Sequence, residues 1–183
     1  MSKDTLVDQF TMTHWAVLKS IDGIDHDESI RLPEMAGNSL NWVLGHLIVT
    51  RGEILELLGR DAIWTASESE IYKRGSDRLT DPARATDFGK IKSDFAASQE
   101  VLLEALEAQT PETLSSRVGF SFVGRDEDSL EAALAGFAFH EAYHVGQIVQ
   151  LARHLRGPDW VSLSIPRGKS DEFNTGMQRK QGK

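Results

Sequence analysis

The sequence predicts an all-α fold, a four-helix bundle in a single domain. Four segments place apolar residues on one face at the 3.6-residue period of a helix. No segment shows the sustained alternation of apolar and polar residues that is typical of a half-buried strand. Four amphipathic helices bury their apolar faces most simply by packing around one shared core.

The first helix is predicted over about residues 3–21, and the polar stretch DGIDHDES ends it. The second helix is predicted to begin at Asn38 or Ser39, which are both good N-caps, and to end at Gly59. Both segments carry a continuous apolar stripe, whose members are Val7, Phe10, Val17 and Ile21 in the first and Leu40, Val43, Leu47, Ile54 and Leu58 in the second.

The third helix is predicted to start after Asp81-Pro82 and to end at Thr110-Pro111, because proline cannot continue a helix. The fourth and longest covers about residues 126–156, with Gly157-Pro158 as its stop. The long connection from Arg60 to Ala85 is typical of a crossover or a functional loop. Its apolar residues, Trp64, Ile71 and Tyr72, predict that it packs down on the bundle, and the segment GFSFVG predicts a short strand pair.

The bundle is predicted over residues 1–158, with residues 159–183 as an extension that is partly docked or flexible.

The composition of the chain excludes several classes of function. The chain has no cysteine, which excludes disulfides and thiolate ligands and leaves His, Asp and Glu as metal ligands. A formal charge of -8 argues against binding to nucleic acid. No apolar run approaches the roughly eighteen residues of a membrane span, so we expect a cytoplasmic protein.

Two histidines of the fourth helix carry the main functional signal. His140 and His144 are one turn apart, so their rings project from the same face. By helical phase both fall within the apolar arc, so the imidazoles are expected to point into the bundle. Such a pair is either a clamp for a metal ion or two core histidines that hydrogen-bond to neighbouring polar groups.

A third histidine, His46, lies at the edge of the apolar stripe of the second helix and is a candidate to face the same point. Three histidines leave coordination positions open, as in catalytic rather than structural metal sites. All-nitrogen ligation suits one divalent zinc or nickel ion first, with iron and manganese as further candidates. His14, on the apolar face of the first helix, is interpreted as a core histidine.

The segment HEAYH also matches HExxH, the zinc-protease motif in which the glutamate is the general base. Glu141 would then be the catalytic residue. The extended form of the motif requires glycine and histidine where this chain has Gln147 and Gln150, so a protease is the weakest alternative. Glu141 is otherwise a partner of the metal site or an ordinary carboxylate at the boundary of the apolar arc.

Trp42 and His46, in a W-x-x-x-H pattern, together with HEAYHVGQIVQLARHL, resemble the DinB/YfiT-like family over residues 3–156. The resemblance implies that His46, His140 and His144 are the metal ligands and that Gln147 is the glutamine of the HxxxHxxQ motif. It also implies frequent homodimers and an activity on small molecules. Members are thiol-dependent S-transferases or isomerases that use a low-molecular-weight thiol, or metal-dependent hydrolases.

Two classes of function remain open from the sequence. An enzyme of the thiol type requires a substrate-sized pocket beside the metal, and a hydrolase also requires a base, for which Glu141 and Glu53 are the candidates. A non-catalytic, dimeric metal-binding bundle with a role in stability or stress response requires neither. Arg74, in the long connection, is interpreted as either a solvated loop residue or a holder of a substrate carboxylate.

Overall fold

The computed structural model describes residues 2–34 and 37–157, so the predicted extension 159–183 lies outside the described residues. The all-α expectation is confirmed, because helices make up most of this part and the sheet has only two short strands. In chain order the elements are α1 (Lys3–Ile21), α2 (His26–Ser29), α3 (Leu40–Leu57), α4 (Ala66–Ser69), the 3-10 helix η1 (Pro82–Arg84), α5 (Phe88–Glu107), α6 (Pro111–Ser115), β1 (Arg117–Val118), β2 (Asp128–Ser129) and α7 (Leu130–Arg156).

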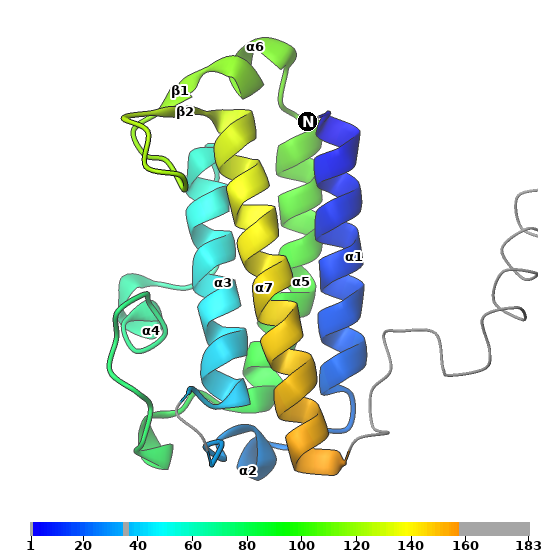
Figure 1. Ribbon diagram of the computed structural model, residues 1–183, viewed down its shortest axis with the longest axis vertical. Coiled ribbons are helices and arrows are strands. Elements are labelled where there is room, and N and C mark those ends of the chain that lie inside the picture. Colours follow the sequence, from blue (N-terminus) through cyan, green and yellow to red (C-terminus); the bar gives the residue numbers. More distant parts are fainter. Residues whose placement is uncertain (1, 35–36, 158–183) are drawn as a thin grey trace, which may run out of the picture.

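The long helices α1, α3, α5 and α7 lie side by side and form the body of the molecule (Figure 1). Helices α1 and α3 each pack against both α5 and α7. Helices α3 and α5 run in the same direction, so the chain between them has to return along the length of the helices (Figure 1). This is the physical reason for the long connection, which carries α4 and η1 on the outside of α3.

Local capping explains where the long helices begin and end. Ser39 caps α3 by accepting a hydrogen bond from the backbone N–H of Trp42 at 3.3 Å, as predicted. Gly59 follows the end of α3 with a φ of +75°, a conformation that favours glycine. Helix α5 starts later than predicted, because Pro82–Arg84 forms a separate 3-10 turn and Asp87 is the N-cap.

The start of α7 also differs from the prediction. The residues just before it, Asp128–Ser129, pair in antiparallel fashion with Arg117–Val118, and Ser129 then caps the helix. A strand pair was predicted from the segment GFSFVG, but neither strand includes it, since β1 ends at Val118 before the segment and β2 begins at Asp128 after it. The short helices α2, α4 and α6 were not predicted, since one turn is too brief to show a helical period, although each begins with a capping box.

The buried apolar residues come from all four long helices and from the long connection. Trp64 and Tyr72 are buried against α3, which confirms that the connection packs down on the bundle. Within the described part of the chain, no helix has the length and apolar character needed to cross a membrane. The three histidines that the sequence singled out meet at the contact between α3 and α7.

Candidate metal centre

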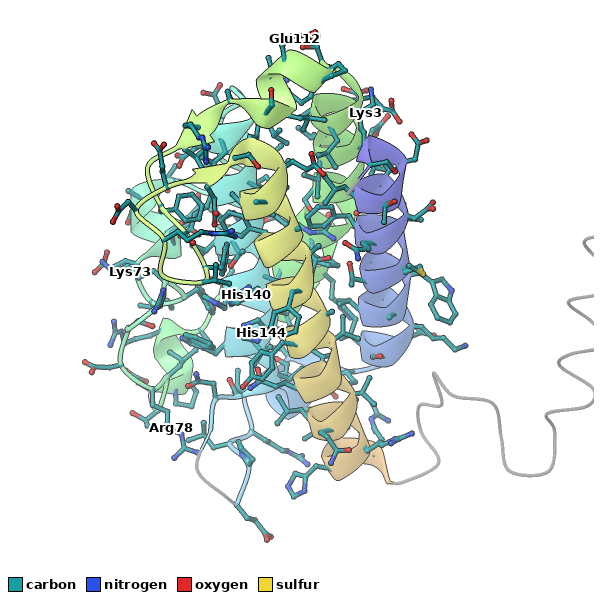
Figure 2. All side chains as sticks on the ribbon, turned by 45° about the horizontal axis from the view of Figure 1, so that its top comes forward. Lys3, Lys73, Arg78, Glu112, His140 and His144 are labelled. Carbon is teal, nitrogen blue, oxygen red and sulfur yellow. The ribbon has the colours of Figure 1, made fainter. Side chains whose placement is uncertain are left out.

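Three imidazoles converge between α3 and α7. The Nε2 atom of His140 lies 3.0 Å from Nε2 of His144 and 3.4 Å from Nε2 of His46. The potential ligand atoms of the three residues all lie within 4.8 Å of one another. Figure 2 shows His140 and His144 one turn apart on α7, near the middle of the helix. The structure therefore brings together all three histidines that the sequence singled out.

Hydrogen bonds fix which nitrogen of two rings carries the proton. Nδ1 of His46 lies 2.8 Å from the backbone carbonyl oxygen of Tyr72, and Nδ1 of His144 lies 2.7 Å from Oε1 of Gln147. Both oxygens only accept, so each Nδ1 must donate its N–H, and the neutral ring then presents a lone pair at Nε2. A metal-binding histidine is commonly oriented in this way by a carbonyl or carboxylate behind it.

The single proton of His140 cannot satisfy all the nitrogen atoms that meet in the cluster. Its Nδ1 is buried and has no hydrogen-bond partner among the described residues. If Nε2 carries the proton, it can donate to only one of its two neighbours; if Nδ1 carries it, three lone pairs face one another. A tetrahedral ion with metal–nitrogen bonds of about 2.0–2.1 Å separates its ligand nitrogens by about 3.3 Å. Two of the three Nε2–Nε2 distances, 3.0 and 3.4 Å, are close to this spacing.

Burial keeps all three rings in the neutral form that binds a metal. It is the main cause that lowers the pKa of each histidine, and it brings the pKa of His144 to about 4. The neighbouring imidazoles lower the pKa of His140 and His144 further, whereas the hydrogen bond to Tyr72 opposes the shift at His46. The ligands therefore need not lose protons at neutral pH before an ion binds.

Tyr72 positions His46, and sequence reasoning had treated it only as a packing residue. Its ring lies directly on α3 at Gly45, where any Cβ would overlap it, so the glycine permits the close approach. Its hydroxyl donates to Oδ1 of Asn41 at 2.8 Å and accepts the backbone N–H of Thr86 at 2.8 Å. These contacts fix the position of the Tyr72 backbone carbonyl, which accepts the hydrogen bond from Nδ1–H of His46.

An open pocket of about 820 Å³ adjoins the histidines. It lies between α3 and α7 and is bordered by the segment after α4 and by the loop between β1 and β2. Its walls combine two of the histidines with charged, hydroxyl and aromatic side chains: His46, Thr50, Glu53, Glu56, Leu57, Arg74, Phe120, Ser121, Phe122, Phe137 and His140. Desolvation and the neighbouring Glu56 raise the pKa of Glu53.

Residues 3–169 match a protein family whose description is protein of unknown function (DUF1572). The chain belongs to this family. No curated protein matches the sequence. The fold is similar to the crystal structure of the conserved protein of locus from Enterococcus faecalis, with a TM-score of 0.67 and 16% identity over 86% of this chain and 99% of that one. Both findings are compatible with the DinB-like resemblance, and neither carries that name.

In this DUF1572 protein Glu141 does not face the histidines. Its carboxylate pairs with the guanidinium of Arg51, with 2.7 Å between Oε1 and Nη2 and 3.0 Å between Oε2 and Nε, and Oε1 also accepts the hydroxyl of Thr13 at 2.6 Å. Arg51 and Glu141 are 0% and 1% exposed. Both carboxylate oxygens are engaged, so the role of Glu141 as a catalytic base stays a prediction without support from this geometry.

His14 is also outside the three-histidine group of the DUF1572 chain. Its ring stacks on Phe95 with 5.2 Å between centroids, and its Nδ1 lies 3.4 Å from Nη1 of Arg51. Burial, followed by the charge of Arg51, lowers the pKa of His14 to about 4. The residue belongs to the packing around the Arg51–Glu141 pair.

Proposed function

We propose that this protein is a divalent-metal-dependent enzyme that acts on a small molecule, with His46, His140 and His144 as the metal ligands. The observation that carries the proposal is the convergence of three Nε2 atoms. In His46 and His144 the hydrogen bond made by Nδ1 leaves the lone pair of Nε2 available to a metal ion. Zinc or nickel suits this all-nitrogen set best, and iron or manganese comes next. A bound ion would act as a Lewis acid toward a thiol or a water molecule at its open side.

The pocket favours an enzyme over a non-catalytic metal-binding bundle. A site that serves only stability is usually closed by four protein ligands and has no need of a cavity. Here two of the three histidines line a space of about 820 Å³, within the range of small-molecule sites. The residues of the pocket would bind and orient the substrate beside the ligands and exclude part of the surrounding water.

Thiol-dependent transfer or isomerisation is the reaction class that we favour, as in the DinB-like proteins that the sequence resembles. It needs space for a low-molecular-weight thiol and an electrophile but no protein base, and Glu141 is already paired with Arg51. Hydrolysis is the second candidate. Its base would be Glu53, which stands in the pocket wall with a raised pKa but two turns of α3 away from His46, so the substrate would have to lie between this carboxylate and the histidines.

The bundle type and the assembly of the DinB-like proteins are part of the same proposal. The parallel course of α3 and α5 and the long connection between them agree with that type of bundle (Figure 1). The aromatic side chains of Phe139 and Tyr143 are exposed one turn apart on the outer side of α7, a candidate surface for a homodimer. The mass of the protein in solution, measured by light scattering, tests the homodimer.

Metal content of untagged protein tests the metal centre. The wild type should bind near-stoichiometric metal after reconstitution with zinc, nickel, iron(II) or manganese, and a His140→Ala/His144→Ala variant should not. His154→Ala is the matched control, because His154 is exposed on the same helix. Equal metal in the double variant and the wild type would refute the assignment. The metal-loaded wild type is then assayed in parallel for thiol transfer and for hydrolysis. The His140→Ala/His144→Ala variant serves as the negative control in both assays.

A further inference from the structure

The pocket beside the histidines has two chemically different walls. One is formed by α3, where His46, Thr50, Glu53 and Leu57 succeed one another along one face. His46 and Leu57 are eleven positions apart, about 16 Å at 1.5 Å per residue, so the pocket is elongated along this helix. The two carboxylates of this wall, Glu53 and Glu56, lie toward its far end, away from the histidines.

The opposite wall is aromatic. Phe137, on α7, is in edge-to-face contact with Phe120 and Phe122 from the loop between β1 and β2, with ring centroids 5.8 and 4.9 Å away. Phe122 packs onto the backbone of α7 at Gly136, where a Cβ would overlap its ring. Phe122 is nevertheless 45% exposed, so part of this apolar surface faces the pocket rather than the core.

Arg74 is the one arginine or lysine among the described residues that line the pocket. Its guanidinium makes no hydrogen bond or ion pair within residues 2–34 and 37–157, although it lines the cavity. Arg74 follows Tyr72 by two residues, and the backbone carbonyl oxygen of Tyr72 lies 2.8 Å from Nδ1 of His46, so the backbone at Arg74 lies beside the histidine end of the pocket. A guanidinium that is free of protein partners offers its N–H groups to a carboxylate or phosphate of a ligand.

We infer that this pocket binds small organic anions, whose charged group is held by Arg74 and whose apolar part lies against Phe120, Phe122 and Phe137. The orientation follows from the charges, because Glu53 and Glu56 repel an anion at the far end of α3, whereas Arg74 attracts it toward the histidines. The inference rests on the proposed function, since it names the substrate class of the same site.

The test compares a charged probe with a neutral one of the same shape. We would titrate 4-phenylbutyrate and 4-phenylbutyramide into the full-length protein, with and without metal, and follow binding by calorimetry. Arg74→Met should weaken binding of the acid at least about tenfold, the effect of losing one charged hydrogen bond, and leave the amide unchanged. Butyrate, which lacks the ring, should bind more weakly than 4-phenylbutyrate in the wild type.

Arg78→Met is the matched control and should bind the acid as the wild type does. Arg78 is an exposed arginine in the same connection, and Figure 2 places it well away from His140. Among the described residues its side chain bonds only to the carbonyl of Pro33, at 3.5 Å. Equal affinity of the acid for the wild type and Arg74→Met would overturn the inference, and so would equal binding of the acid and the amide to the wild type.

Metal content measured on the same samples separates this inference from the proposed function. Protein that binds metal but shows no dependence on Arg74 would overturn the substrate class alone. Protein that never binds metal but still distinguishes the acid from the amide through Arg74 would overturn the metal function alone. Comparing the metal-free and metal-loaded forms also removes the contribution of a carboxylate that binds the ion directly.

Discussion

Replacing Glu141 with glutamine is expected to destabilise the protein by about 3–5 kcal/mol, the usual cost of removing one partner from a buried ion pair. The structure supports this magnitude. Glu141 receives two hydrogen bonds from the guanidinium of Arg51, at 2.7 and 3.0 Å, and a bond to a charged group contributes about 1.5–3 kcal/mol. Arg51 would remain buried, held by Ser98 at 2.7 Å and stacked over Phe95 at 4.1 Å, with its charge no longer balanced.

Urea unfolding followed by circular dichroism at neutral pH measures the effect. The matched control is Glu70→Gln, since the pair of Glu70 with Lys73 is exposed and should contribute less than about 1 kcal/mol. A double variant, Arg51→Met/Glu141→Leu, should lose less stability than the sum of the single changes, because no charge is then left buried alone.

A Glu141→Gln cost as small as that of Glu70→Gln would refute the reasoning. The same variant also tests the catalytic role predicted from the HExxH pattern. If Glu141→Gln keeps its fold, stability and metal but loses turnover, Glu141 is a base after all. If activity falls only in proportion to the folded fraction, its role is structural.

Three further substitutions give independent predictions. Gln147→Ala removes the acceptor behind one ligand and should weaken metal binding about 10–100-fold in a chelator competition, whereas Gln150→Ala, exposed on the same helix, should not. Gly45→Ala forces Tyr72 off α3 and should lower both the thermal midpoint, by an overpacking cost of about 1–3 kcal/mol, and the metal content. His14 has its pKa lowered from 6.5 to about 4 in the folded protein, so the unfolded chain takes up its proton first as the pH falls. The folded protein therefore loses stability as the pH falls from 6.5 to about 4. In His14→Gln this loss should be smaller, which is measured by comparing the urea midpoints of the variant and the wild type across this pH range.

Local sequence features predicted the helices and the histidine site because both depend on short-range geometry. A helical period and a capping serine at Ser39 are properties of neighbouring residues. The spacing of His140 and His144 fixes their common face without any knowledge of the fold. The placement of His46 depended on the apolar stripe of its helix, and the structure confirms that it faces the other two.

The partner of His46 and the role of Arg51 could not be predicted, because both depend on contacts between distant segments. The carbonyl of Tyr72 reaches His46 only because the connection crosses α3 at Gly45. Arg51 was not among the residues that the sequence singled out. Helix α3 is buried around most of its circumference, and this all-round apolar character was the available signal that a charge within it needs a partner.

The position of Glu141 shows how packing determines the chemistry of an HExxH pattern. Consecutive residues of a helix point about 100° apart, so the packing on that side of the helix decides whether the glutamate that follows His140 reaches the histidine site. Helix α1 covers that side of α7, which places the carboxylate against Thr13 and Arg51 instead of solvent. In this chain the segment therefore carries the proposed metal ligands on one side of the helix and a buried anion on the other. Because Arg51 of the facing helix α3 pairs with that anion, Glu141 joins helices, and a base for the pocket has to come from elsewhere.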